Sequence, residues 1–534
     1  MTDRGSFLKS VRWSDWLWSL IAGCILGALL TGLDGQGHLW SQGWLAYGLV
    51  SALGLGLMAW VWRQAGSLRW LGILSLVALG LRLVIGVGAS LVLPTLGTDS
   101  QVQKAGYLSV DAYHRDQQAW ELAGSPDPIL KAFDKRYAVD QYGGLEALSA
   151  LVYRYLSPDA HRPWLVILLA ALASALGVVV AYRASRLAWN ESLAIITAWI
   201  MAFYPESLLW DSSQMREPFL LTFIAMSFLG LVLWRRQHTK NGWGWLAAGL
   251  FGLLLFSPGI ALFIILLLAG WTWLERREKR ISWVVLAVGG CVLLLGMLLL
   301  WAALARGTLQ GAPLLAALPD WFKLSVKWDV YQLERDSGMV QYLFRQVLPP
   351  SLKLPFVFVY GLLQPVLPAA IFEPSKPVWM IAGILRSLGW YLLLPLLAYS
   401  LVALLRSESG GRKWAWVWLY ALTWVWISLS SLRAGGDQWD NPRYRLILLL
   451  FEAALVARCW LYYRETRDAW LPRLVFIEMA FLIVTGWWYA GRYTHLVPIL
   501  SFSLMAGLMI GFTSLVLAGG VWWDWRIKKL SVDR

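Results

Sequence analysis

Long apolar runs separated by short polar segments make up most of this chain. A helix of about 17 to 25 predominantly apolar residues crosses the hydrocarbon core of a membrane. Runs near this length cover residues 14–33, 44–62, 70–93, 164–182, 191–204, 219–234, 242–256, 259–275, 281–304, 378–405, 414–432, 446–463, 474–490 and 498–523. The pattern predicts an all-α polytopic membrane protein with about 14 transmembrane helices, within a range of roughly 12 to 14.

The composition agrees with a membrane protein, because 58% of the residues are hydrophobic and only 15% are charged. Many of the 37 Trp lie near the ends of apolar runs, as in the aromatic belts of membrane interfaces. The net charge of +14 is spread over short clusters between the runs. It therefore indicates topology signals and contacts with anionic lipid, and no nucleic-acid partner. The three cysteines lie inside apolar runs without CxxC spacing, which supports neither a disulfide framework nor a zinc site.

The basic residues predict the orientation of the helices. Most of the Lys and Arg in short connections fall on one side, which the positive-inside rule assigns to the cytoplasm. The short segments of the other side carry Arg216, Arg433, Arg443, Arg445 and Arg492. With an uncleaved first helix, this predicts a multi-pass membrane protein and places the outer segments, with any active site they carry, on the extracytoplasmic side.

Two long segments, 94–163 and 306–377, are then expected outside. Apolar residues recur at helical spacing over 145–155, which predicts an amphipathic helix in the membrane interface. The stretch 345–372 is apolar but interrupted by prolines, so it is interpreted as a re-entrant or interfacial piece, and whether it crosses the membrane stays open.

A dense polar segment follows the third apolar run, from Thr98 to Ser125. Asp111 opens its helical part, followed by His114 and Arg115. A carboxylate just outside the bilayer can act as general base towards a hydroxyl or amine. Solvation of an extracytoplasmic loop is the alternative, and Asp99 and Asp116 of the same segment serve as controls.

Arg82 interrupts the apolar run ALGLRLVIGVG. An unpaired charge at membrane depth costs about 2.5 to 3.5 kcal/mol on insertion scales, so either a functional role or an ion pair with a carboxylate of a neighbouring helix is expected. Arg386 poses the same choice in a later run.

The connection between the runs 191–204 and 219–234 is rich in ionisable residues. These are Glu206, Asp211, Arg216 and Glu217. Acids here could orient a sugar, or hold a divalent cation together with Asp111. Helix capping by Asp211 or Ser212, with Pro218 in the first turn, is the competing interpretation.

The late segment RAGGDQWDNPRYRL places Arg443 and Arg445 beside an apolar run. Guanidinium groups bind phosphate oxygens bidentately, so these arginines could bind a lipid phosphate or pyrophosphate. A solvated turn at residues 440–442 is the alternative. The chain contains no P-loop, GxGxxG after a strand, HExxH or GxSxG motif.

Several of these short motifs together resemble the GT-C fold glycosyltransferases, in particular the branch of the bacterial lipid A aminoarabinose transferase and the protein O-mannosyltransferases. The resemblance rests on Arg82, on Asp111 with its "Y…A..LA" continuation, on QYGGLEALSALVYRYL, on YPESLLWDSSQMRE and on NPRYR. It covers residues 70–450. Residues 1–69 would then be two additional transmembrane helices, and residues 451–534 would be C-terminal ones.

The resemblance implies an inverting transfer of a sugar from a polyprenyl-phosphate donor to a lipid, glycan or protein acceptor. Carried over, it makes Asp111 the base, lets Glu206 and Glu217 line the site, and puts Arg443 or Arg445 near the donor phosphate. The family often has a second acid directly after the first, whereas here Ala112 follows Asp111, so a Mg or Mn cofactor stays open.

Two other functions fit the same pattern. An O-antigen polymerase or ligase also has many helices and a large outer loop, and it would depend on a loop arginine instead of Asp111. A flippase for a lipid-linked sugar would need charges along a central cavity, and few charges other than Arg82 and Arg386 lie inside the apolar runs.

Overall fold

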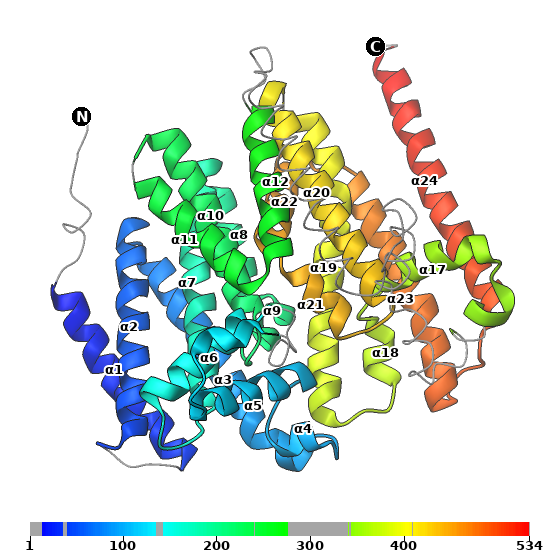
Figure 1. Ribbon diagram of the computed structural model, residues 1–534. Coiled ribbons are helices and arrows are strands. Elements are labelled where there is room, and N and C mark those ends of the chain that lie inside the picture. Colours follow the sequence, from blue (N-terminus) through cyan, green and yellow to red (C-terminus); the bar gives the residue numbers. More distant parts are fainter. Residues whose placement is uncertain are drawn as a thin grey trace, which may run out of the picture. The chain divides into compact units, whose positions relative to one another are not determined.

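The computed structural model describes residues 13–35, 40–134, 142–239, 241–275, 340, 343–407 and 409–532. Every regular element in these residues is a helix (Figure 1). Ten of the helices are long and apolar enough to cross a membrane, or eleven if one bent pair counts as a single span. The all-α polytopic class is therefore confirmed. The predicted count of fourteen transmembrane helices is not confirmed. The run 281–304 and residues 306–339 of the second long segment lie outside the described residues.

The chain divides into two compact units, which are described separately. The N-terminal unit contains Met1–Ala269 and Leu446–Ala454, and the C-terminal unit contains Gly270–Arg445 and Leu455–Arg534.

The N-terminal unit is built around α7, most of whose residues are buried. The long helices of this unit are α1 (Trp13–Asp34), α2 (Gln42–Gln64), α3 (Arg69–Leu96), α7 (Trp164–Ala188) and α10 (Glu217–Gln237), and α12 (Pro258–Glu275) begins in it. α8 (Glu191–Phe203) and α11 (Asn241–Phe256) have only 13 and 16 residues, which is short for a full span. Two of the predicted runs therefore form shorter helices than a membrane span requires.

Glycines allow the first two helices to pack closely. A Cβ atom at Gly23 would lie 2.7 Å from the backbone nitrogen of Ala52, and one at Gly27 would lie 2.7 Å from that of Gly48. Close approach of helix backbones through small residues is the usual way in which apolar helices associate within lipid.

Four short helices connect α3 to α7 and lie together at one end of the long helices (Figure 1). They are α4 (Gln101–Lys104), α5 (Val110–Gly124), η2 (Ile129–Phe133) and α6 (Gly144–Leu156). α6 is the helix that the sequence predicts here: Leu145 and Val152 of the predicted apolar face are buried, whereas Leu151 and Tyr155 of the same face are exposed. Its position in the membrane interface stays a prediction. We call this end of the N-terminal unit its loop side.

The C-terminal unit contains long helices and two short, proline-containing ones. The long helices are α19 (Pro377–Ser407), α20 (Gly410–Ala434), α23 (Trp470–Thr494) and α24 (Phe502–Val532), and most of α22 (Leu449–Thr466) also belongs to this unit. The stretch 345–372 forms α17 (Pro350–Leu363) and α18 (Leu367–Phe372) after a short turn, η4 (Leu343–Val347). α17 has 14 residues, and its end is separated from α18 by Gln364, Pro365 and Val366. This broken pair agrees with the interpretation of the stretch as an interrupted piece.

Candidate functional site

Arg82 forms an ion pair with Asp211 in the interior of the N-terminal unit. The guanidinium nitrogen Nη2 lies 3.2 Å from Asp211 Oδ2, and both side chains are fully buried. The remaining donors of Arg82 reach Ala78 O, Ala202 O, Met201 O and Ser207 Oγ at 3.0 to 3.2 Å. Arg82 thus joins α3 to the end of α8 and to the short helix α9 (Pro205–Trp210). All of these contacts of Arg82 are to the protein itself. A contact between Arg82 and a substrate stays a prediction.

Asp211 does not cap α10, which corrects one interpretation of the sequence. It follows the last residue of α9, and its Oδ2 accepts hydrogen bonds from Ser174 and Ser207 at 2.5 Å in addition to the arginine. The N-cap residue of α10 is Arg216, which makes no side-chain capping bond there. The expected Pro218 in the first turn is confirmed. The carboxylate forms the ion pair because a buried arginine needs a counter-charge.

The start of α5 packs against the turn that leads into α10. Ser109, the N-cap of α5, has its Oγ 3.6 Å from Met215 Sδ, and Arg115 Nη1 donates to Gln214 O at 3.2 Å. Since Asp111 lies in the first turn of α5, and Arg216 and Glu217 begin α10, these contacts bring the polar ends of both helices to one place. We call this place the loop-side corner.

Solvent exposure separates the predicted site residues of this corner into two groups. Asp111 and His114 are exposed, and Arg216 is half-buried with its guanidinium carbon 5.7 Å from the ring centre of Tyr142. In contrast, the buried members are Arg115, Glu206 and Glu217. Glu206 accepts a hydrogen bond from the indole nitrogen of Trp210. The first group can touch a ligand directly, whereas the second can only shape the corner from within.

Asp116 is buried beneath the corner and is therefore not a matched control for Asp111. It accepts hydrogen bonds from the hydroxyl groups of Tyr107, at 2.6 Å, and Tyr153, and His161 Nε2 lies 2.8 Å from it. Burial, and then the nearby Asp116, raise the pKa of both phenols above the ordinary value, so that they remain hydrogen-bond donors even above pH 10. Asp99 is almost fully exposed beside Lys104 and is the better control.

Sequence reasoning did not find this cluster. Tyr153 and His161 are 37 and 45 residues from Asp116, and no local spacing signals such a pairing. The burial of Asp116 on a helix whose other face carries Asp111 becomes visible only when α6 packs on α5. In the part of the chain that the structure describes, no group of three or more His, Cys, Asp or Glu side chains is arranged as metal ligands.

The late arginines of the C-terminal unit bind their own chain. Residues 440–442, for which a solvated turn was the alternative interpretation, are the start of α21 (Asp440–Leu446). Asn441 is buried, with its amide donating to Gly361 O and Gly435 O. Arg443 Nη2 lies 3.0 Å from Asp440 Oδ1, and Arg445 Nη1 donates to Leu362 O at 2.9 Å. The solvated-turn interpretation is thus wrong, because the helix buries its polar residues against α17 and α20.

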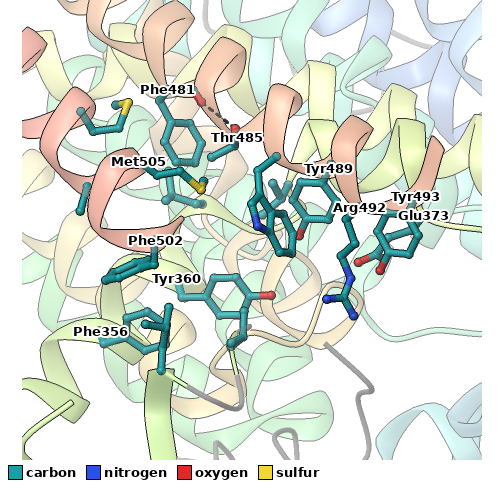
Figure 2. A pocket seen from close by; sticks show the side chains of 17 residues that line it. Phe356, Tyr360, Glu373, Phe481, Thr485, Tyr489, Arg492, Tyr493, Phe502 and Met505 are labelled. Atoms are coloured by element: carbon teal, nitrogen blue, oxygen red, sulfur yellow. Dashed lines mark hydrogen bonds between the residues drawn. The ribbon is translucent and has the colours of Figure 1, made fainter. Parts of the chain in front are cut away.

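Two further arginines of this unit lie against aromatic rings. Arg386 donates to Gln438 O at 2.8 Å and lies 4.3 Å from the ring centre of Trp439. Arg492 lines an aromatic pocket of about 200 Å³ together with Tyr493 (Figure 2). Its guanidinium carbon lies 5.5 Å from the ring centre of Trp488 and 5.6 Å from that of Tyr493. From the sequence alone, Arg492 counted only as a basic residue of an outer segment. Its place in a pocket wall with Tyr360 and Phe502 depends on how α17, α23 and α24 pack.

Comparison with known proteins assigns no family to this arrangement: no protein-family model matches the chain, and no match was found among the curated proteins.

Proposed function

We propose that this protein is an integral membrane glycosyltransferase that moves a sugar from a polyprenyl-phosphate donor to an extracytoplasmic acceptor. The observation that carries the proposal is the loop-side corner. An exposed carboxylate, Asp111, begins a helix that packs beside the start of α10, where Arg216 is half-buried. A general base and a guanidinium at the end of apolar helices suit a reaction between two substrates that the membrane holds in place.

In the proposed reaction Asp111 accepts the proton of the acceptor hydroxyl while the acceptor oxygen forms a bond to the anomeric carbon. The bond from that carbon to the phosphate oxygen breaks, and the electron pair leaves with the polyprenyl phosphate. Attack from the face opposite the phosphate inverts the anomeric centre. Arg216 is suited to stabilise the charge of the departing phosphate, since arginine binds phosphate oxygens through paired donors.

The other predicted residues take supporting roles in this proposal. His114 is exposed three residues after the base and could contact either sugar. Glu206 and Glu217 shape the corner from within, and Arg82 fixes α9 beneath it. Binding of the donor phosphate by Arg443 or Arg445 remains a separate prediction, as does the use of Mg or Mn.

The test is sugar transfer by the purified protein from a panel of polyprenyl-phosphate sugars, repeated with Asp111→Asn. Loss of a general base is expected to lower the rate about 10²- to 10⁴-fold. Asp99→Asn, an exposed acid of the same connecting segment, should keep the wild-type rate. A folded Asp111→Asn variant with full transfer activity would contradict the assignment of Asp111 as the general base.

The same assay separates the other two functions. A polymerase or ligase would lose activity on replacement of an arginine and tolerate Asp111→Asn. A flippase would move the lipid-linked sugar across reconstituted vesicles and leave the bond between sugar and phosphate intact.

A further inference from the structure

An apolar groove of about 810 Å³ lies between the helices of the N-terminal unit. Its walls come from α2, α7, α10 and α11, and Val152 and Leu156 of α6 close one end. Thr222 and Asn241 are the polar side chains among its lining residues. The hydroxyl of Thr222 donates to Ala173 O at 2.6 Å, so it is already satisfied by the protein. A ligand in this groove would meet almost only hydrocarbon.

The length of the groove follows from the pairing of α10 with α11. Phe219, in the first turn of α10, lines it near the loop side, and Asn241, the first residue of α11, lines it at the opposite end. Gly242 packs against Trp234, since a Cβ there would lie 2.6 Å from the Trp234 backbone nitrogen. A Cβ on Gly242 would also lie 2.8 Å from Gly230 O, so the lining residues extend from Phe219 to a level between Gly230 and Trp234 of α10. This is about 16 to 22 Å at the helical rise of 1.5 Å per residue.

This length exceeds the depth of one membrane leaflet. Half of a hydrocarbon core of about 30 Å is about 15 Å, and the acyl chain of a phospholipid ends near the midplane. Trp60 and Trp245 stack at the far end of the groove with ring centres 5.5 Å apart. Because tryptophan is enriched at membrane interfaces, this pair agrees with a groove that spans most of the hydrocarbon core. A single chain must be longer than a leaflet to fill it.

We propose that the groove binds the long apolar chain of the lipid-linked sugar donor, an isoprenoid chain that enters at the loop side and passes the membrane midplane. This inference rests on the proposed function for the identity of the lipid. The loop-side end of the groove lies close to the candidate site, because Phe219 follows Glu217 by two residues on α10. Its α2 wall, from Val50 to Trp60, belongs to residues 1–69, which precede the part of the chain that resembles the glycosyltransferases.

Two glycines provide a groove variant and its matched control. Gly244 lines the groove, and a Cβ atom there would meet no other atom within 4 Å. Gly80 of α3 is equally open within its helix but does not line the groove. Leucine at either position suits a helix better than glycine, so both variants are expected to fold. Only Gly244→Leu places new atoms in the path of the chain, and Ala248→Leu, one turn later in the groove wall, does the same.

The experiment measures binding of a polyprenyl phosphate of eleven isoprene units, of farnesyl phosphate and of phosphatidylglycerol to the purified full-length protein in nanodiscs. We expect the long chain to bind at least about tenfold more tightly than farnesyl phosphate, because the short chain leaves most of the apolar wall uncovered. Gly244→Leu and Ala248→Leu should each weaken binding of the long chain about fivefold or more, and Gly80→Leu should not.

Equal binding of the two phosphates, or wild-type binding by both groove variants, would overturn the inference, as would binding of phosphatidylglycerol alone. The proposed function can fail separately. The wild type could bind the long chain more tightly than the short one, with the groove variants weakening that binding, and yet transfer no sugar. This result would support the groove as the chain-binding site and contradict the proposed transferase activity. Sugar transfer at equal rates from short-chain and long-chain donors would support the proposed transferase activity and contradict the groove as the chain-binding site.

Discussion

Two buried arginines, Arg82 in the N-terminal unit and Arg445 in the C-terminal unit, solve the same structural problem with different chemistry. Each satisfies carbonyl groups at the end of a helix that breaks before a short one: Arg82 at the end of α8, and Arg445 at the end of α17. Such carbonyls lack helical partners, and water is scarce among apolar helices. In both places an arginine from a distant part of the chain donates hydrogen bonds to these carbonyl groups.

The two arginines differ in what surrounds the charge. Arg82 contacts the carboxylate of Asp211, with both side chains fully buried. Arg445 lies over the ring of Trp390, its guanidinium carbon 3.7 Å from the ring centre, while the indole nitrogen of Trp390 donates to Leu362 O. The comparison teaches that a helix break inside an apolar protein can be stabilised by a counter-charge or by an aromatic face.

The largest expected effect comes from removing one member of the ion pair. Arg82→Met leaves Asp211 buried without its counter-charge, and we expect a loss of about 3 to 5 kcal/mol in the free energy of unfolding. Denaturant unfolding in detergent micelles measures it. The double variant Arg82→Met/Asp211→Leu should recover much of the loss, because no unpaired charge remains. A double variant as unstable as the single one would show that the carbonyl contacts of Arg82, not its charge, matter most.

A smaller loss is expected at Arg445. Arg445→Met removes the donors to Leu362 O and Gln364 O together with the stacking on Trp390, which we expect to cost about 2 to 3 kcal/mol. Lysine substitution sharpens the comparison, because an ammonium can pair with Asp211 but cannot stack flat on an indole ring or span two carbonyls. Arg82→Lys should therefore retain more stability than Arg82→Met, whereas Arg445→Lys should resemble Arg445→Met in the same unfolding assay.

The Asp116 cluster is a buried polar group of another kind, in which two tyrosine hydroxyls and an imidazole surround the carboxyl group. Burial raises the pKa of Tyr107 and Tyr153, so the folded protein keeps their protons above pH 10 while the unfolded chain releases them. The stabilisation is complete below about pH 10 and is lost as the pH rises further, by about 1 kcal/mol per tyrosine between pH 10 and 11. Unfolding midpoints against pH measure it. The Tyr107→Phe/Tyr153→Phe variant should decline less steeply, and an identical slope would exclude these two groups.

The smallest effects should come from single neutral donors at the two arginine clusters. Ser207→Ala removes a hydroxyl that accepts from Arg82 and donates to Asp211, and Trp390→Phe removes the indole donor but keeps a ring face for Arg445. Each should cost about 1 kcal/mol, the usual contribution of one hydrogen bond. A much larger loss for Trp390→Phe would mean that the indole, more than the arginine, holds the end of α17.

The sequence by itself determined the class of the protein and the positions of its helices. The length and apolarity of a run are local properties, so ten of the fourteen predicted runs coincide with helices that can cross a membrane. The helical nature of α5 and α6 and the break between α17 and α18 were also readable, because side-chain periodicity and proline act over a few residues. The demand of Arg82 for a partner was equally clear, since a charge among apolar residues cannot remain unpaired at low cost.

Only the tertiary structure decided which groups meet. Asp211 lies 129 residues from Arg82 in the chain, and from the sequence it was equally suited to cap a helix. Asp111 and Asp116 are five residues apart, a rotation of about 140° on a helix, so one faces outward and the other lies beneath α6. Periodicity fixes that rotation but not which face a distant helix will cover. The partners of a polar group are set by packing between segments far apart in the chain, and local pattern carries no record of that packing.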